Sequence, residues 1–473
     1  MRNGRGLATR PAIAVSGVLA LALAVAAAAL ASSGSDAAPA QPRLRVAAVA
    51  QDPCHPLRAL PVPAQLSGQF DADSSIVRTA GQVYAAPGRL VPLTRSEQAC
   101  VATAERGDRA WLRAGFVPGA TATQQSMALR ALLDLRLAVQ PDGAVLAGWY
   151  PGWEYAWPRD SSWVAAALAG AGHPDLAYRI LRFLQRVQAT DGTWAARYLP
   201  DGSGPVRDGR PAELDADGWV PWAVWSWALT QRLTPGSPAR RALGRLWPML
   251  VRAADAATRS LAGDGLPGPA LDYWEDTVQV TLGTAAPLLA GLRAAADLAA
   301  DIGGTAPAAE GRRWGAAATR LARAIAATFG RTGYQRTPAA GSGADAAVTF
   351  LGPPFAGADP AVLRAVNSAQ RALAFPGGGL RPGIRWPGTP GVAWTPETAV
   401  FALFDAATGQ RSQAAVLLAW LAGHRTRLGS LAEQVNSAFQ PASVAPLSWT
   451  DAVTLLTLLA QAGDLPTLPV PAL

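Results

Sequence analysis

The chain has 473 residues, of which 50% are hydrophobic and 16% charged, enough apolar material for one large core or two domains. Its formal net charge is +8. A positive charge indicates nucleic-acid binding only when the basic residues cluster on one face. Here the arginines are scattered. In "LAYRILRFLQRV", for example, Leu176 and Ile180 fall on one helical face and Arg179 and Arg182 on the other. The charge pattern therefore excludes a nucleic-acid-binding function.

The first 40 residues have the features of a targeting segment. Arg2, Arg5 and Arg10 precede an apolar stretch over residues 12–31, which small polar residues follow. This order predicts a signal peptide over residues 1–40. The apolar stretch is long for a signal, so an uncleaved membrane anchor is the alternative. Both interpretations predict a secreted or extracellular protein that contacts a membrane only through this segment.

Cysteine and histidine are rare in the chain. Cys54 and Cys100 are its two cysteines, and in an oxidising compartment they are expected to form a disulfide. Two free, buried thiols are the alternative. The three histidines and two cysteines show no metal-site spacing, and no G-x-S-x-G segment supports a serine nucleophile. We therefore expect that the protein uses neither metal nor cofactor. We also expect a monomer.

From about residue 119 onward, apolar positions recur every three or four residues, which predicts an all-α domain over residues 119–473. The Pro-rich residues 41–118 predict an irregular N-terminal arm or cap. "DGAVLAGW" near Asp142 is the best strand candidate, as a small hairpin or an extended loop. The expected helices lie at 121–137, 161–170, 174–189, 217–231, 237–258, 277–302, 306–329, 359–373, 395–408, 411–422 and 448–462.

Long Gly/Pro-rich loops between these helices combine aromatic and charged residues. In "YPGWEYAWPRDSSW" the aromatic cluster precedes Arg159 and Asp160. An arginine–aspartate pair can bind sugar hydroxyls while aromatic rings pack on the C–H faces. Each acid could instead mark an ordinary helix start. The pattern recurs in "ELDADGWVPWAVWSW", "LDYWEDTVQV", "GIRWPGTPGVAW" and "GSLAEQVN", and five such loops favour a carbohydrate cleft.

In order and spacing, these motifs resemble those of glycoside hydrolase family 15, the glucoamylases. "YAWPRDSS" is similar to the family's Tyr-x-Trp-x-Arg-Asp-Ser motif, and "LDADGW" to an Asp-Gly segment before an inner helix. "DYWED" resembles the segment that holds the general acid, "GSLAEQVN" the segment that holds the general base, and "LSWTDAVTLL" the start of the last helix. The resemblance covers residues 120 to 462.

The resemblance implies an (α/α)6 barrel and inverting exo-hydrolysis of α-linked glucosides, with an α-linked oligosaccharide as substrate. By position, Glu275 is the expected general acid and Glu433 the general base. The carboxyl groups of an inverting pair stand about 6.5–9.5 Å apart, which two glutamates on separate loops can meet. We further expect Trp274 and Asp276 to disfavour ionisation of Glu275. The expected substrate-binding residues are Trp153, Tyr155, Trp157, Arg159, Asp160, Trp274, Asp276, Arg385 and Trp394.

The chain also departs from the family pattern. Asp276 stands where a second glutamate is common, Trp153 where fungal members have tyrosine, and "QVN" follows the base where Tyr-Asp is frequent. Two further hypotheses therefore stay open. The chain could be a trehalase or a glucodextranase on the same barrel, or a non-catalytic carbohydrate-binding relative.

Overall fold

The computed structural model describes residues 40–51, 59–62, 68–79, 82–85, 89–92 and 94–469. Residues 41–473 form one compact unit. The expected targeting segment and Cys54 lie outside the described residues, so the signal and the Cys54–Cys100 disulfide remain predictions. Within the described ranges, no helix is both long and apolar enough to cross a membrane.

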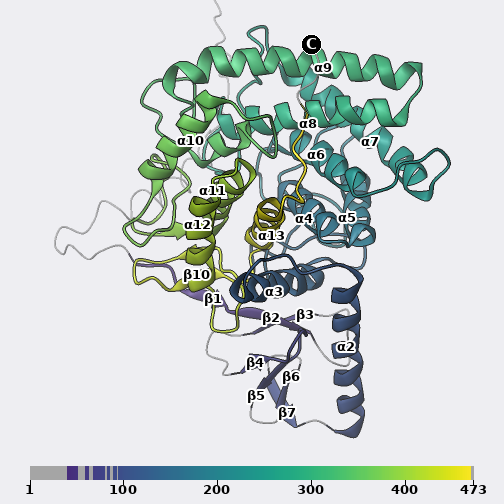
Figure 1. Cartoon of the computed structure of the whole chain (residues 1–473), viewed down its shortest axis with the longest axis vertical. Helices are drawn as coiled ribbons and strands as arrows, with labels where there is room; N and C mark the ends of the chain where they lie inside the picture. The colour runs from purple at the N-terminus through teal and green to yellow at the C-terminus, as the bar shows by residue number, and fades with distance from the viewer. Residues whose placement is uncertain are drawn as a thin grey trace, which may run out of the picture. The chain divides into compact units, whose positions relative to one another are not determined.

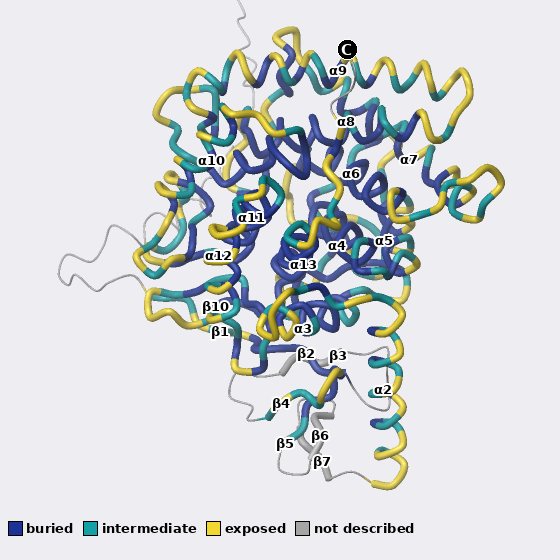
Figure 2. The backbone as a smooth tube through the Cα atoms, viewed as in Figure 1, coloured by how far each residue is buried: buried dark blue, intermediate teal, exposed yellow. Residues whose placement is uncertain are grey.

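Six inner elements form a closed ring, in which each contacts the next and the last contacts the first (Figure 1). Five are α-helices and the fourth in chain order is a short 3-10 helix. Figure 2 shows them largely buried. The inner elements are α4 (Pro158–Gly170), α6 (Ala216–Leu229), α8 (Leu282–Ile302), η2 (Ala346–Leu351), α11 (Thr395–Ala407) and α13 (Ser448–Ala462).

An outer helix alternates with each inner element along the chain and packs against it. This alternation confirms the predicted (α/α)6 barrel. The outer helices are α3 (Ala122–Ala138), α5 (Pro174–Val187), α7 (Pro238–Ser260), α9 (Thr305–Thr328), α10 (Pro360–Leu373) and α12 (Arg411–Gly423); a second 3-10 helix, η1 (Phe329–Thr332), follows α9.

The two layers differ in how much of each helix is buried. On α5, Leu176, Ile180 and Leu184 form the buried stripe that the sequence predicts. On α6, by contrast, every residue from Ala216 to Ala228 is buried. The tryptophans of "ELDADGWVPWAVWSW" therefore mostly build the core. Trp219 and Trp222 pack against Trp163 with ring centroids 5.0 and 5.3 Å apart.

Glycines let inner helices α6 and α8 approach closely. A Cβ atom on Gly218 would lie 2.0 Å from the carbonyl oxygen of Pro287, and one on Gly291 would lie 2.5 Å from the Cα of Gly218. Both distances are far below van der Waals contact, so the two backbones touch where only glycine fits.

The N-terminal arm is more regular than predicted. It contains short strands and one long helix, α2 (Arg95–Ala114), which begins with a capping box formed by Thr94 and Glu97. Strands β2 and β3 pair with each other, and β4 to β7 form an antiparallel sheet. The arm's strands are β1 (Leu44–Val46), β2 (Ala48–Gln51), β3 (Ala59–Val62), β4 (Gln69–Phe70), β5 (Val77–Thr79), β6 (Gln82–Ala85) and β7 (Arg89–Pro92).

Two further sequence expectations need correction. The helix expected over 277–302 begins at Leu282, because residues 270–279 instead form a turn closed by the Ala270–Gln279 bridge. The segment 331–358, expected to be a loop, contains the inner element η2. The "DGAVLAGW" segment, expected as a small hairpin or an extended loop, makes the isolated antiparallel bridge Val139–Val145.

Candidate active site

A cavity of about 390 Å³ opens where the inner helices begin. Sites for small ligands have this size and this mixture of aromatic and polar walls. The N-terminal ends of helices also favour negative charge. The cavity is lined by Ala147, Gly152, Trp153, Trp157, Arg159, Asp160, Arg197, Arg210, Tyr273, Trp274, Glu275, Pro382, Trp386, Trp394, Pro396, Glu397, Glu433, Leu447 and Trp449.

The segment that carries Glu275 is held by a buried network. Asp272 accepts a hydrogen bond from the backbone N–H of Trp274 at 3.0 Å and from Arg336 at 3.1 Å. Arg336 also pairs with Asp345 at 3.2 Å, which in turn accepts from the hydroxyl of Tyr273 at 2.7 Å. Asp272 therefore fixes the turn that presents Glu275.

Glu275 has an uncommon backbone conformation, with φ of +53°. Non-glycine residues in the left-handed region are rare and cluster at functional sites. The indole Nε1 of Trp157 donates to Glu275 at 2.9 Å. Arg159 lies 3.8 Å from its carboxylate, and Arg210 forms an ion pair with it. Two arginines therefore face the carboxylate of Glu275, and the expected influence of Trp274 and Asp276 on its ionisation stays a prediction.

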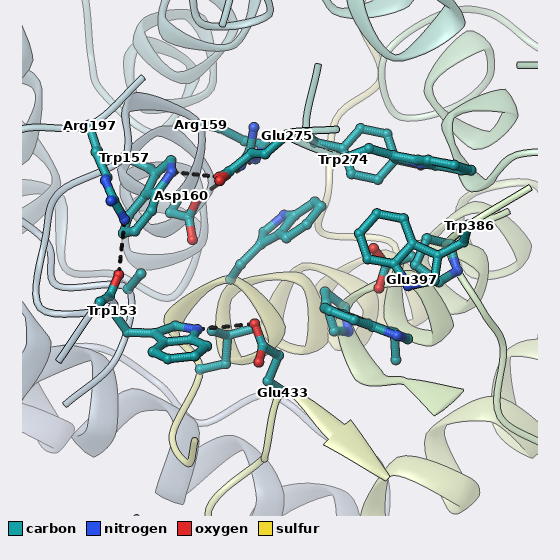
Figure 3. Close-up of a pocket in the computed structure, with 18 of the residues that line it drawn as sticks. Trp153, Trp157, Arg159, Asp160, Arg197, Trp274, Glu275, Trp386, Glu397 and Glu433 are labelled. Atoms are coloured by element: carbon teal, nitrogen blue, oxygen red, sulfur yellow. Dashed lines mark hydrogen bonds and ion pairs between the residues drawn. The ribbon is translucent and has the colours of Figure 1, made fainter. Parts of the chain in front are cut away.

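Glu433 lies on the opposite side of the cavity from Glu275 (Figure 3). Trp153 donates its indole N–H to Glu433 at 3.1 Å, and the hydroxyl of Ser443 donates to the other carboxylate oxygen. Burial raises the pKa of Glu433 above its ordinary value, while the bonds from Ser443 and Trp153 pull it back down. Both oxygens thus accept hydrogen bonds, as suits a carboxylate.

A small sheet joins Glu433 to the N-terminal arm. Strand order is β1, β10 (Pro441–Val444), β9 (Gln434–Val435) and β8 (Ala393–Trp394). Glu433 directly precedes β9, and its backbone N–H donates to the carbonyl of Val444 at 2.9 Å. Leu44 on β1 pairs with Ser443, the residue that donates to Glu433. The arm therefore supports the loop that carries the candidate base.

Arg159 contacts three buried carboxylate groups. Arg159 contacts Glu213 at 2.5 Å, Asp215 at 3.1 Å and Asp160 at 3.7 Å. Burial raises the pKa of Asp160 to about 6 and that of Glu213 to about 8, although Arg159 opposes both shifts. Because Arg159 is anchored by Glu213 and Asp215, it is held rigidly at the cavity wall beside Asp160.

Three tryptophans form an aromatic wall. Trp386 packs edge-to-face against Trp274 with ring centroids 5.0 Å apart, and against Trp394 at 5.2 Å. Arg336 stacks on Trp274 at 3.5 Å from the ring centroid. Such a wall offers flat apolar surface for the C–H face of a sugar.

The structure brings most of the predicted site residues together, but not all. Glu275 and Glu433 line the cavity together with Trp153, Trp157, Arg159, Asp160, Trp274 and Trp394. Three others lie outside its lining. Asp276 and Arg385 are exposed, and Arg385 donates to the carbonyl of Gly341 at 3.3 Å. Tyr155 instead packs beneath the guanidinium of Arg197.

Sequence reasoning missed other lining residues that carry polar or aromatic groups. Trp386 and Trp449 stand in the segments "GIRWPGTPGVAW" and "LSWTDAVTLL", but neither was among the expected substrate-binding residues, and their aromatic character was the available signal. Arg197 and Arg210 belong to a loop between α5 and α6 whose approach to the cavity has no local signature. Glu397 looks like an ordinary helix-start acid in sequence. Within the described parts of the chain, no three His, Cys, Asp or Glu residues are grouped so as to hold a metal ion.

The chain is similar in sequence and in structure to known glycosidases. No protein-family model matches it. An uncharacterized glycosyl hydrolase of Methanocaldococcus jannaschii is 28% identical over 172 residues, which is 36% of this chain. The matched region spans 26% of that curated relative.

Several solved structures share the fold. A glycosidase in complex with glucose has a TM-score of 0.59 at 21% identity, covering 73% of this chain and 98% of its own. A bacterial glucoamylase complexed with acarbose has a TM-score of 0.60 at 16% identity, covering 78% and 60%. The glucoamylase of Saccharomycopsis fibuligera has a TM-score of 0.52 at 12% identity, covering 68% and 89%. The predicted resemblance to glucoamylase-like glycosidases is thereby confirmed, with the barrel as the shared fold.

Proposed function

We propose that the protein is an inverting, exo-acting α-glucoside hydrolase that releases glucose from the non-reducing ends of α-glucan oligosaccharides. The observation that carries the proposal is the placement of two glutamates, Glu275 and Glu433, on opposite sides of one cavity. Each accepts an indole N–H from the same loop, through Trp157 and Trp153. Inverting hydrolysis requires one carboxylic acid and one carboxylate on opposite faces of the sugar.

In this mechanism Glu275, once protonated, gives its proton to the glycosidic oxygen as the bond to the anomeric carbon breaks. Glu433 takes a proton from a water molecule, whose oxygen forms the new bond from the opposite face. The products are a sugar with inverted configuration and the free alcohol. Glu433 is then protonated and Glu275 ionised, and exchange with solvent restores both.

The protein's other groups assist this reaction. Arg159 and Asp160 are proposed to hold the hydroxyls of the terminal sugar, and the wall of Trp274, Trp386 and Trp394 to pack on its apolar faces. Tyr273 and Trp449, which are 9% and 7% exposed, line the cavity, and in this proposal they receive the end of the sugar chain.

Two solved structures of this fold add support. One glycosidase of this fold is described in complex with glucose, and a bacterial glucoamylase with acarbose. The first glycosidase is also described as two single-glutamate variants. In its chain those glutamates are separated by nearly the same number of residues as Glu275 and Glu433 are here.

The proposal is tested by measuring glucose release from maltose, isomaltose and trehalose, with the Glu275→Gln/Glu433→Gln double variant as the control. We expect release from maltose or isomaltose by the parent protein and none by the variant. Release from trehalose alone would identify a trehalase instead. Glucose binding without release from any of the three would indicate a non-catalytic relative.

A further inference from the structure

A third glutamate lines the cavity. Glu397 lies in the first turn of α11 and is 3% exposed. Figure 3 shows it beside Trp386, on the wall away from Glu275. It belongs to the same inner-helix end as Trp394, which directly precedes α11. The proposed chemistry uses Glu275 and Glu433 and gives no role to Glu397.

Glu397 differs from the two other glutamates of the cavity in its hydrogen bonding. Glu275 accepts from Trp157, and Glu433 from Trp153 and Ser443. The Oε2 atom of Glu397 is buried and has no hydrogen-bond partner among the described residues. Leaving a buried polar atom unpaired is costly, and buried polar groups normally have a partner. A ligand in the cavity can supply one.

The surroundings of Glu397 keep it neutral. Burial raises its pKa to about 8, and the negative charges of Glu433 and Asp345 add to the shift, while its own backbone N–H and Arg159 oppose it. The hydroxyl of Tyr273 is also within electrostatic range of Glu397. A neutral carboxyl group has one O–H donor and keeps an acceptor. A sugar hydroxyl likewise donates one hydrogen bond and accepts others, so the two groups are complementary.

An ordinary helix-start role does not account for these features. An acid in the first turn interacts with the helix N-terminus equally well when exposed, as Asp175 does on α5. Glu397 is instead buried beside Glu433 and Asp345, where its charge is costly. A carboxyl group that binds a ligand in the cavity explains this buried position.

We propose that Glu397 is a specificity-determining residue that exchanges hydrogen bonds with a hydroxyl of the terminal sugar. This inference rests on the proposed function, because it takes the sugar to occupy this cavity. It also predicts the substrate class: the terminal residue must be a neutral hexose. A uronic acid there would bring a carboxylate beside Glu433 and Asp160, and like charges at that range repel.

The test measures binding without turnover. Isothermal titration of glucose into the Glu275→Gln variant is compared with the Glu275→Gln/Glu397→Gln and Glu275→Gln/Glu397→Ala variants between pH 6 and about 9. Glutamine keeps a neutral donor and acceptor but cannot ionise. At pH 6, we expect the Kd for glucose to change less than about threefold when Glu397 is replaced by glutamine. Replacement by alanine should raise this Kd at least about tenfold.

The pH dependence gives the second readout. Glu397 is neutral below its folded pKa and ionises as the pH rises through about 8, so glucose binding should weaken there. Glu213 titrates in the same window, and the Glu397→Gln variant separates the two. The proposal is supported if the part of the weakening that is due to Glu397 disappears from the pH profile of the Glu397→Gln variant. An unchanged pH profile, or a Kd that does not move with alanine, overturns it.

The choice of hydroxyl is tested with the four monodeoxy glucoses, at carbons 2, 3, 4 and 6. One of them should bind at least about tenfold more weakly than glucose to the Glu275→Gln variant, and that penalty should disappear in the Glu397→Ala background. If every penalty is the same in both backgrounds, Glu397 contacts no hydroxyl.

Failure of glucose to bind any variant would contradict the proposed function itself, so the two failures are distinguishable. Should alanine prevent folding, the pH profile of glucose binding to the Glu275→Gln/Glu397→Gln variant provides the decision.

Discussion

Trp153 donates its indole N–H to Glu433 at 3.1 Å, although the two residues are 280 positions apart in the chain. Trp157, on the same loop, makes the matching bond to Glu275. One loop therefore sets the position of both candidate catalytic groups. An indole N–H can only donate, so it favours the ionised form of the carboxylate it contacts.

The assignment of the acid predicts a large effect of a small change. Glu275→Gln keeps size and hydrogen bonding but removes the transferable proton, so kcat on maltose should fall at least about 10²-fold. Asp276→Asn is the matched control, because Asp276 is exposed and lies outside the cavity lining. Its kcat should stay within about threefold of the parent. Normal turnover by Glu275→Gln would refute the assignment.

Ser443 is expected to tune the base. Its hydroxyl donates to Glu433 and lowers a pKa that burial raises. Ser443→Ala removes that bond, so the pKa of Glu433 should rise further. A base works only when ionised, and activity is lost as the pH falls through its pKa. The acid limb of the kcat/KM profile should therefore move to higher pH. Ser437→Ala, an exposed change on the turn between β9 and β10, should leave the limb in place. Equal profiles for both variants would count against Glu433 as the base.

Arg210 is expected to act on the acid. Its ion pair with Glu275 favours the carboxylate, whereas acid catalysis needs the protonated form. Arg210→Gln should make Glu275 harder to ionise, and the basic limb of the kcat/KM profile should then move to higher pH. Arg207→Gln removes an exposed charge from the same loop and serves as the control. A basic limb that moves to lower pH with Arg210→Gln would contradict this account.

The contact between α6 and α8 predicts opposite effects of two glycine substitutions. Gly218→Ala puts a Cβ against the backbone of Pro287, and overpacking of this kind costs roughly 1–3 kcal/mol of unfolding free energy. Gly315→Ala on α9 meets nothing within 4 Å and should stabilise by roughly 0.5–1 kcal/mol. Urea denaturation measures both. Equal stability of the two variants would show that α6 and α8 do not pack as described.

The barrel could be predicted from sequence because its signal is local and repeated. Outer helices such as α5 show apolar periodicity, and inner helices such as α6 are mostly apolar on all sides. The element η2 was missed because six residues are too few to show a period. The arm's strands were missed because they have only two to four residues each, which gives alternation no room to appear.

The site was predictable where a motif holds the functional group and its support together. Arg159, Asp160 and Trp157 stand in one segment, and Glu275 follows the turn that Asp272 fixes. Asp276 was misplaced because the chain turns at Glu275 and directs the next residue to solvent. The contributions of Arg210 and Glu397 depend on tertiary contacts with distant loops, which no local pattern reveals.

The most direct test of the central claim is the configuration of the first product. Proton NMR should follow hydrolysis of maltose before mutarotation equilibrates the anomers. If Glu433 activates water opposite Glu275, β-glucose appears first from the non-reducing end, and Glu433→Ala releases none. If Glu433 were instead a nucleophile, with the carboxyl groups about 5–5.5 Å apart, α-glucose would appear first. Initial release of α-glucose would contradict both the role of Glu433 and the proposed function.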